Sequence, residues 1–114
     1  MKNPKYQLYK SGSEYRFRLK ARNGEIILKS EGYTSKSSCL SGIESVKRNS
    51  PYDNRYERKI STNQKYYFVL KAANGEIIGV SELYSSRQSR EVGINSVKLV
   101  APSAPIEDLT LAIF

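Results

Sequence analysis

The stretch Tyr15–Lys47, YRFRLKARNGEIILKSEGYTSKSSCLSGIESVK, decides the fold because it returns as Tyr66–Lys98, YYFVLKAANGEIIGVSELYSSRQSREVGINSVK, without a gap. Of its 33 positions, 20 are identical at a constant offset of 51. A short unit repeated in register usually cannot bury its own apolar face and needs its copy as a partner. We therefore predict a single domain over residues 1–114, with repeats at about 5–55 and about 56–110 and an apolar tail at 111–114.

The composition is that of a small globular protein whose positive charge is unevenly divided. The net charge is +8, with 12 basic and 5 acidic residues in 1–55 against 7 and 6 in 56–114. No segment is long and apolar enough to span a membrane, and Met1–Pro4 lacks the apolar core of a secretory signal. The lone Cys39 cannot form an internal disulfide, which fits a reducing compartment. We therefore predict a basic, cytoplasmic protein without membrane contact.

Two successive β-hairpins are predicted between residues 5 and 31. Lys5–Lys10 and Glu14–Arg22 alternate polar and apolar residues around a turn at Ser11–Ser13. Asn23–Gly24 is typical of a two-residue type I′ turn, which needs positive φ at both residues and fixes the register. The predicted buried face of the first repeat is Phe17, Leu19, Ala21, Ile26 and Leu28. In the second repeat, Asn74–Gly75 repeats the turn and the buried face is Phe68, Leu70, Ala72 and Ile77, with Gly79 at the place of Leu28.

A helix is predicted to follow each pair of hairpins. The first begins among the hydroxyl residues Thr34–Ser38, buries Cys39, Ile43 and Val46, and ends near Asn49–Pro51. The second begins at Ser85 or Ser86, where Ser85 and Gln88 have capping-box spacing, and ends before Pro102. Gly42 and Gly93 lie in mid-helix at matching positions, at a cost of about 1 kcal/mol each relative to alanine, which indicates close packing there.

The segments after the helices, Tyr56–Ile60 and Pro105–Leu109, are predicted to be strands. The first of them also aligns with the opening strand of the first repeat, so strands are shared between the copies. We predict an α+β fold in which two β(3)-α-β repeats form one antiparallel sheet, with two helices on one face and a pseudo-two-fold axis.

The repeated motif resembles the YegP-like family of small bacterial tandem-repeat proteins. It consists of Phe17-x-Leu19-Lys20-Ala21-x-Asn23-Gly24-Glu25, Ser30-Glu31-x-Tyr33 and Gly42-Ile43-x-Ser45-Val46-Lys47, and it recurs over Phe68–Lys98. The resemblance covers about Tyr6 to Thr110 and implies a sheet with exchanged C-terminal strands and a bacterial origin. It implies no activity, because the family has no assigned molecular function. The tail Leu111–Phe114 extends past the usual end of the family, and its apolar character suggests that it is docked.

The residue types present argue against catalysis. The absence of histidine removes the usual neutral-pH base and imidazole metal ligands, and Cys39 on an apolar helix stripe indicates core packing rather than a reactive thiol. No catalytic residue, metal site or cofactor is predicted. One enzymatic alternative stays open: Glu31 and Glu82, with Tyr33 and Tyr84, could line a shared pocket if the two copies converge. The carboxylates of Glu25 and Glu76, which adjoin the turns, are expected to be solvated.

The outer face of the sheet offers two candidate binding surfaces. Possible anion-binding residues form a basic row in the first repeat: Arg16, Arg18, Lys20, Arg22 and Lys29. The matching part of the second repeat carries a possible protein interface at Tyr67, Val69 and Val80. An ordinary solvated sheet face is the third interpretation.

Taken together, the sequence predicts a non-catalytic interaction module, and nucleic-acid or other polyanion binding through the basic row is the alternative. The oligomeric state is left as a monomer or a weak homodimer. Structural roles are predicted for the residues shared by both copies: Asn23, Gly24, Gly42, Asn74, Gly75 and Gly93.

Overall fold

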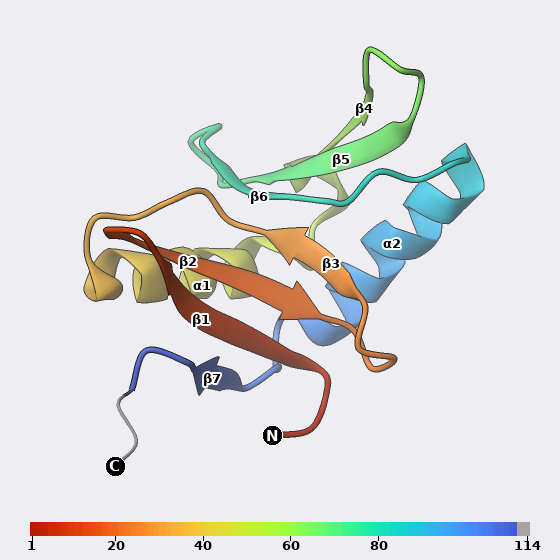
Figure 1. The fold of residues 1–114 in the computed structure, drawn as a ribbon. Helices are drawn as coiled ribbons and strands as arrows, with labels where there is room; N and C mark the ends of the chain where they lie inside the picture. Colours follow the sequence, from red (N-terminus) through yellow and green to blue (C-terminus); the bar gives the residue numbers. More distant parts are fainter. Residues whose placement is uncertain (112–114) are drawn as a thin grey trace.

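Figure 1 shows a single sheet with both helices on one side of it. The computed structural model describes residues 1–111. The strands are β1 (Lys5–Ser11), β2 (Glu14–Lys20), β3 (Ile26–Lys29), β4 (Tyr56–Ile60), β5 (Tyr66–Lys71), β6 (Ile77–Val80) and β7 (Ile106–Asp108). The helices are α1 (Lys36–Asn49), α2 (Arg87–Val100) and the short 3-10 helix η1 (Asp53–Arg55).

The seven strands follow the order β4-β5-β6-β3-β2-β1-β7. Every pairing is antiparallel except that of β1 with β7, which is parallel, so the sheet is mixed. The strand after each helix pairs with the other repeat, since β4 follows α1 and pairs with β5, and β7 follows α2 and pairs with β1. The predicted α+β class, the single sheet, the two helices and the exchange of C-terminal strands are confirmed. The prediction of a purely antiparallel sheet is wrong, because β7 returns after α2 to join β1 in parallel.

The predicted type I′ turns are wrong, although both hairpins are present. Among residues 1–111 the only non-glycine residue with positive φ is Gln64, so Asn23 and Asn74 do not adopt the left-handed conformation. Instead, the Gly24 amide donates to the Ala21 carbonyl at 2.9 Å, and Gly24 alone has positive φ, at 85°. The Asn23 side chain accepts from the Glu25 amide at 3.0 Å, which stabilises this alternative turn. The loop is one residue longer than predicted and is a type I turn followed by a bulge.

The bulge changes which isoleucine of each hairpin is buried. Leu19 still pairs with Leu28 as predicted, but Lys20 pairs with Ile26, and the register shifts between the two pairs. Ile27 and Ile78 are consequently buried, at 4% and 7% exposure, whereas Ile77 is 42% exposed. The prediction that Ile26 and Ile77 belong to the buried face is therefore wrong. Both repeats make the same shift, because both carry the same turn.

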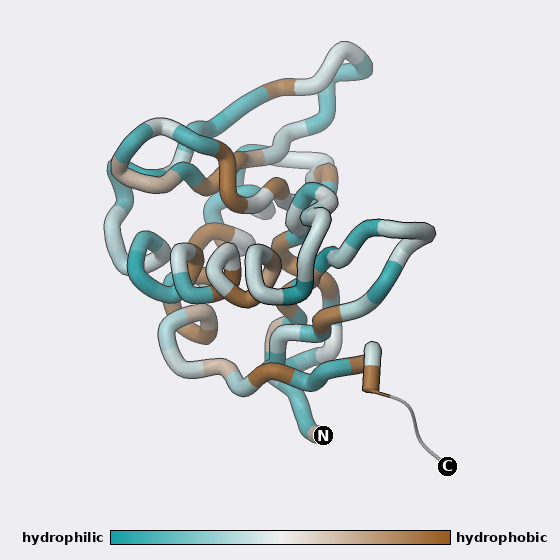
Figure 2. Tube along the Cα trace, turned by 90° about the vertical axis from the view of Figure 1, so that its left-hand side faces the viewer, coloured by the Kyte–Doolittle hydropathy of each residue, from teal (hydrophilic) through white to brown (hydrophobic). Residues whose placement is uncertain are grey.

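The core lies between the sheet and the helices, where Figure 2 shows the hydrophobic residues concentrated. Phe17, Leu19, Leu28, Phe68 and Leu70 are fully buried, as predicted. Leu109 and Leu111 are instead exposed, at 48% and 63%. The rest of the apolar tail, 112–114, lies outside the described residues, and its predicted docking stays a prediction.

The helices begin and end where the sequence predicts, but one predicted N-terminal cap is absent. Ser35 and Ser86 are the N-caps, and each side chain accepts from the amide three residues later. The capping box expected from Ser85 and Gln88 is therefore absent. The mid-helix glycines pack against tyrosines: a Cβ at Gly42 would overlap the hydroxyl of Tyr33, and one at Gly93 would overlap that of Tyr84. This close approach explains why both helices tolerate a glycine.

Two buried tyrosines donate hydrogen bonds to backbone carbonyls at the C-terminal ends of the two helices. The Tyr6 hydroxyl on β1 donates to the Ala101 carbonyl at the end of α2, at 2.7 Å. The Tyr56 hydroxyl on β4 donates to the Ser50 carbonyl at the end of α1, also at 2.7 Å. Burial raises the pKa of both phenols, so they stay protonated donors. Orphan carbonyls at both helix ends are thereby satisfied.

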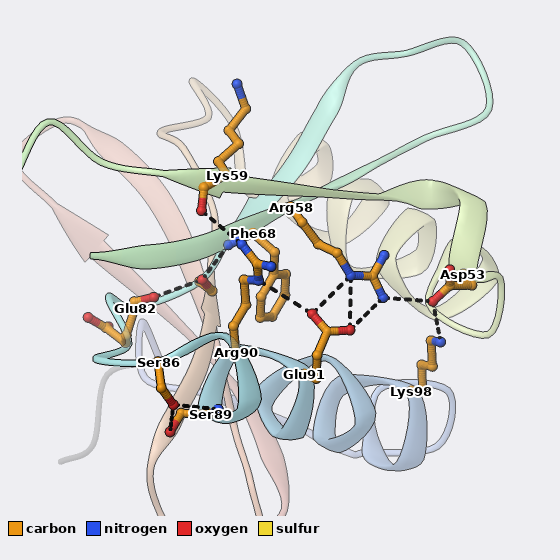
Figure 3. A network of polar contacts seen from close by, with 11 residues as sticks. Asp53, Arg58, Lys59, Phe68, Glu82, Ser86, Ser89, Arg90, Glu91 and Lys98 are labelled. Atoms are coloured by element: carbon orange, nitrogen blue, oxygen red, sulfur yellow. Dashed lines mark hydrogen bonds and ion pairs between the residues drawn. The ribbon is translucent and has the colours of Figure 1, made fainter. Parts of the chain in front are cut away.

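An ion-pair cluster ties the edge strand β4 to α2 (Figure 3). Arg58 binds Glu91 at 2.8 Å and Asp53 at 3.1 Å, and Lys98 also donates to Asp53, at 2.7 Å. Arg90, which aligns with Cys39, donates to the Lys59 carbonyl at 3.2 Å. Hydrogen bonds from Lys98 and then Arg58 lower the pKa of Asp53 to about 2. Hydrogen bonds from Lys71 and then Lys59 do the same for Glu57.

We expect stability to fall in acid as these carboxylates are protonated. Their folded pKa values lie below the unfolded values of about 4, so their contribution is complete above about pH 5 and is lost as the pH falls toward 2. Urea unfolding midpoints at pH 7, 4 and 2.5 would show this decline. The double variant Asp53→Asn, Glu57→Gln should flatten the profile between pH 4 and 2.5, and an equally steep decline in that variant would contradict the assignment.

Candidate functional sites

The face of the sheet opposite the helices carries the predicted basic row. One rung of paired residues crosses all seven strands on this face: Glu107, Gln7, Arg18, Lys29, Val80, Val69 and Glu57. Like charges therefore meet at Arg18 and Lys29, which pair directly across β2 and β3 as predicted. A cationic half of the face adjoins an apolar half at the contact between Lys29 and Val80.

Most cations of the basic row have partners within the molecule. Arg18 donates to the Gln7 side chain at 2.8 Å and lies 4.7 Å from the centre of the Tyr9 ring. Arg16 pairs with Glu14 at 3.3 Å, and Lys29 pairs with Glu82 at 3.0 Å. Lys20 has no ion-pair partner within residues 1–111, and Arg22 lies in the hairpin turn beyond the end of β2. The repulsion between Arg18 and Lys29 is thus offset by contacts inside the protein.

The apolar half of the face offers less surface than its composition suggests. Val69 is only 3% exposed, and Tyr67 and Val80 are half-buried. Glu57, the rung neighbour of Val69, pairs with Lys59 and Lys71 on its two sides. An interface centred on Val69 would therefore have little apolar area to bury.

The helix side of the molecule contains two grooves that the sequence did not predict. The α1 groove, of about 650 Å³, lies between α1 and the tip of the β5–β6 hairpin, so its two walls come from different repeats. The α2 groove, of about 430 Å³, lies between α2 and the tip of the β2–β3 hairpin. Nine lining positions correspond between them: Tyr33, Ser38, Ser41, Gly42, Ser45, Ala72, Asn74, Glu76 and Ile78 match Tyr84, Ser89, Val92, Gly93, Ser96, Ala21, Asn23, Glu25 and Ile27.

The two repeats have kept the same residues at the positions that line both grooves, but they differ at most positions of the outer face. Eight of the nine matched groove positions are identical, the exception being Ser41 against Val92. Of the five positions of the basic row, four differ in the second repeat, because Arg16, Arg18, Arg22 and Lys29 correspond to Tyr67, Val69, Ala73 and Val80. Some groove identities serve the fold, such as the contact of Tyr33 with Gly42. The side chains of Glu76 and Glu25 make no ion pair within residues 1–111.

The shared pocket of the enzymatic alternative is absent from residues 1–111, where its residues lie in two separate pockets. Glu31, Tyr33 and Glu76 line one, and Glu82, Tyr84 and Glu25 line the other. Each therefore combines a carboxylate before a helix with a turn carboxylate from the opposite repeat. Burial, followed by nearby acidic groups, raises the pKa of Tyr33 and Tyr84. Neither hydroxyl has a hydrogen-bond partner within residues 1–111, so both are available to a ligand.

Cys39 is fully buried, and burial raises the pKa of its thiol to about 11, so the predicted core packing is confirmed. The carboxylates whose pKa is shifted are all stabilised in the charged form. Among residues 1–111 no three acidic or cysteine side chains gather as metal ligands, and no helix there is long and apolar enough to cross a membrane.

A helix-periodicity argument could have found one wall of each groove. Ser38, Ser41, Ser45 and Arg48 recur at helical spacing on the side of α1 away from its apolar stripe. The other wall comes from a hairpin in the opposite repeat, and no local signal in the sequence specifies that contact.

Comparison with known proteins places these features in a family. The family described as "Domain of unknown function (DUF1508)" matches residues 11–57 and again 61–108. The UPF0339 protein YegP of Escherichia coli O157:H7 is 55% identical over 106 residues, covering 92% of this chain and 96% of that protein. A UPF0339 protein of Stutzerimonas stutzeri, described as lying in the ptx operon 5′ region, is 51% identical over 91% of this chain and 95% of its own length.

Solved structures agree with the fold. The solution NMR structure of the E. coli protein of unknown function yegP has a TM-score of 0.90 and 50% identity, covering 99% of this chain and 98% of that one. The solution NMR structure of a UPF0339 protein from Shewanella oneidensis has a TM-score of 0.87 and 50% identity, covering 92% and 90%. The doubled motif, the seven-stranded sheet and these relatives lead to one conclusion: the chain belongs to the DUF1508 family of UPF0339 proteins, which are bacterial and uncharacterised.

Proposed function

We propose that this protein is a non-catalytic binding module that holds polar ligands in its α1 and α2 grooves. The observation that carries the proposal is that eight of the nine positions lining both grooves are identical, whereas the outer face has diverged. Each groove presents an unpartnered tyrosine hydroxyl, a turn carboxylate and helix serines, which can orient a ligand by hydrogen bonds. Both grooves are open and lack a perturbed acid-base pair, which favours binding over turnover.

A fragment screen by NMR tests this function. Polar small molecules added to ¹⁵N-labelled protein should shift the amides of Gly42 and Ala72 in the α1 groove, or Gly93 and Ala21 in the α2 groove. Ser41→Trp should block only the first set, because Ser41 is exposed on the wall of the α1 groove. Val92→Trp is the matched control and should block only the second. The proposal would be contradicted if the molecules that bind shift neither set of groove amides, or if a bound molecule is recovered as a chemically altered product.

Polyanion binding by the outer face is a second candidate function. Arg18 favours this function, because Gln7 holds its guanidinium beside the Tyr9 ring on a sheet face that no helix covers. Lys20 on the same face makes no ion pair within residues 1–111. Single-stranded nucleic acid is bound by such combinations of cations and aromatic rings. The first repeat also carries most of the excess positive charge.

Fluorescence polarisation with a labelled single-stranded oligonucleotide distinguishes this candidate. Replacing Arg16, Lys20 and Lys29 by glutamine should weaken binding at least tenfold at 50 mM salt, and higher salt should weaken the wild type steeply. Removing the same number of charges at Lys2, Lys65 and Arg87, which are exposed and lie outside the strands, is the matched control. Equal losses in both triple variants would show a nonspecific charge effect and refute the site.

A further inference from the structure

The α1 groove differs from the α2 groove at one end, where it carries two arginines. Arg48 lies on the groove wall at the end of α1, and Arg55 lies beside it at the end of η1. The residue that matches Arg48 is Leu99, which is 61% exposed, and the residue that matches Arg55 is Ile106 on β7. The basic end is therefore a property of the α1 groove alone.

Neither arginine is neutralised within the described part of the chain. No carboxylate pairs with Arg48 or Arg55 in residues 1–111. The acidic residue between them in sequence, Asp53, is committed to Arg58 and Lys98, as Figure 3 shows. Two cations thus line one end of a groove with no internal counter-charge.

Arg55 is held in position by neutral groups. Its Nε donates to the Asn49 side chain at 2.9 Å, its Nη1 donates to the Asn54 side chain at 3.3 Å, and its guanidinium lies 5.6 Å from the centre of the Tyr52 ring. Asn49 is itself only 8% exposed and donates to the Ser45 carbonyl at 2.8 Å. A guanidinium has five N–H donors, so Arg55 keeps terminal N–H groups for a further acceptor beyond Asn49 and Asn54. This arrangement suits an anion with several oxygens, such as phosphate.

The groove beyond the arginines is lined by hydroxyls and an amide. Ser41, Ser45 and Tyr33 contribute hydroxyls, and Asn74 and Glu76 line the groove from the tip of the β5–β6 hairpin. These groups match the donors and acceptors of a polyhydroxylated ligand body. We propose, on the basis of the groove function above, that the α1 groove binds a sugar phosphate, with the phosphate on Arg48 and Arg55 and the sugar along the serines.

NMR titrations with ribose 5-phosphate, inorganic phosphate and ribose as probes test this inference. Ribose 5-phosphate should shift the amides of Gly42 and Arg48 and the side-chain Nε–H of Arg55, while Gly93 in the α2 groove stays unshifted. Its affinity should exceed that of inorganic phosphate and of ribose by at least tenfold. Arg48→Leu introduces the residue that the second repeat has at the matching position, Leu99, and it should weaken binding at least tenfold. Arg87→Leu removes the same charge from α2 and should leave the affinity unchanged.

Several results would overturn the sugar-phosphate assignment. If the probes shift Gly42 and Gly93 alike and Arg48→Leu changes nothing, the grooves bind but the arginines do not select phosphate. If no probe shifts either groove, the assignment fails, whereas the groove function is judged separately by the tryptophan variants. A ten-residue oligothymidylate that shifts the same amides more strongly than ribose 5-phosphate would replace the sugar phosphate by a nucleic-acid ligand.

Discussion

Residues 1–52, produced without the second repeat, are expected to remain unfolded in solution. The first repeat would lose the strand β7 that pairs with β1, the Ala101 carbonyl that accepts from Tyr6, and the β5 and β6 strands on which α1 packs. A chain of this length buries only about 60% of its surface even when it folds alone. We expect an amide spectrum without dispersion and no near-ultraviolet signal from the tyrosines.

Mixing the fragments 1–52 and 53–114 should restore the fold, because every lost contact lies between the two pieces. A spectrum of the mixture that matches the intact protein would show that the repeats need each other and not the covalent link. A dispersed, monomeric spectrum for 1–52 alone would contradict this expectation.

The first repeat is also expected to be a poor partner for itself. At the centre of the sheet β3 meets β6 through the pair Lys29 and Val80, which are equivalent positions of the two repeats. Two copies of 1–52 arranged in this way would oppose Lys29 with Lys29, which repels, and would bring two Leu28 side chains together. The substitutions that distinguish the repeats are therefore part of what makes them pair with one another.

The sequence was a good guide wherever a feature is local or duplicated. The strands, the helix ends and the buried residues Phe17, Leu19 and Leu28 follow from short-range patterns and are confirmed. The turn type was wrong because Asn–Gly suits two loop lengths, and the Asn23 side chain stabilises the longer one by accepting from Glu25. Because the loop is one residue longer than predicted, Ile27 is buried in place of Ile26.

A second discrepancy lies in the alignment of the opening strands. The constant offset of 51 would match Tyr6 with Glu57, but Tyr6 and Tyr56 occupy equivalent places, since they pair with Leu19 and Leu70. The offset changes to 50 because the matched pairs Lys10–Tyr15 and Ile60–Tyr66 enclose connections that differ by one residue. The longer connection, between β4 and β5, includes Gln64 with φ of 62°. The grooves were missed for a different reason: their walls meet only through the pseudo-two-fold arrangement of the repeats.

Gly79→Leu is expected to destabilise the protein by about 3 kcal/mol through overpacking at the centre of the sheet. A Cβ at Gly79 would lie 2.6 Å from both Cγ and Cδ2 of Leu28. Leu28 is fully buried, so its side chain has no free space into which to move. Leu28→Gly should cost about 4 kcal/mol, because it empties the same space and adds a glycine to a strand.

The double variant Leu28→Gly, Gly79→Leu should recover most of either loss, because the two residues are equivalent positions that exchange roles across the pseudo-two-fold axis. Urea unfolding of the two single variants and the double variant would measure a favourable coupling of about 2 kcal/mol or more. Gly79→Leu combined with Leu8→Ala, which removes another fully buried leucine on β1, is the control and should show additive losses. Additive losses in the exchanged pair as well would mean that Leu28 and Gly79 do not share one space. Coupling would instead show that the sheet's centre accommodates one large side chain and that either repeat can supply it.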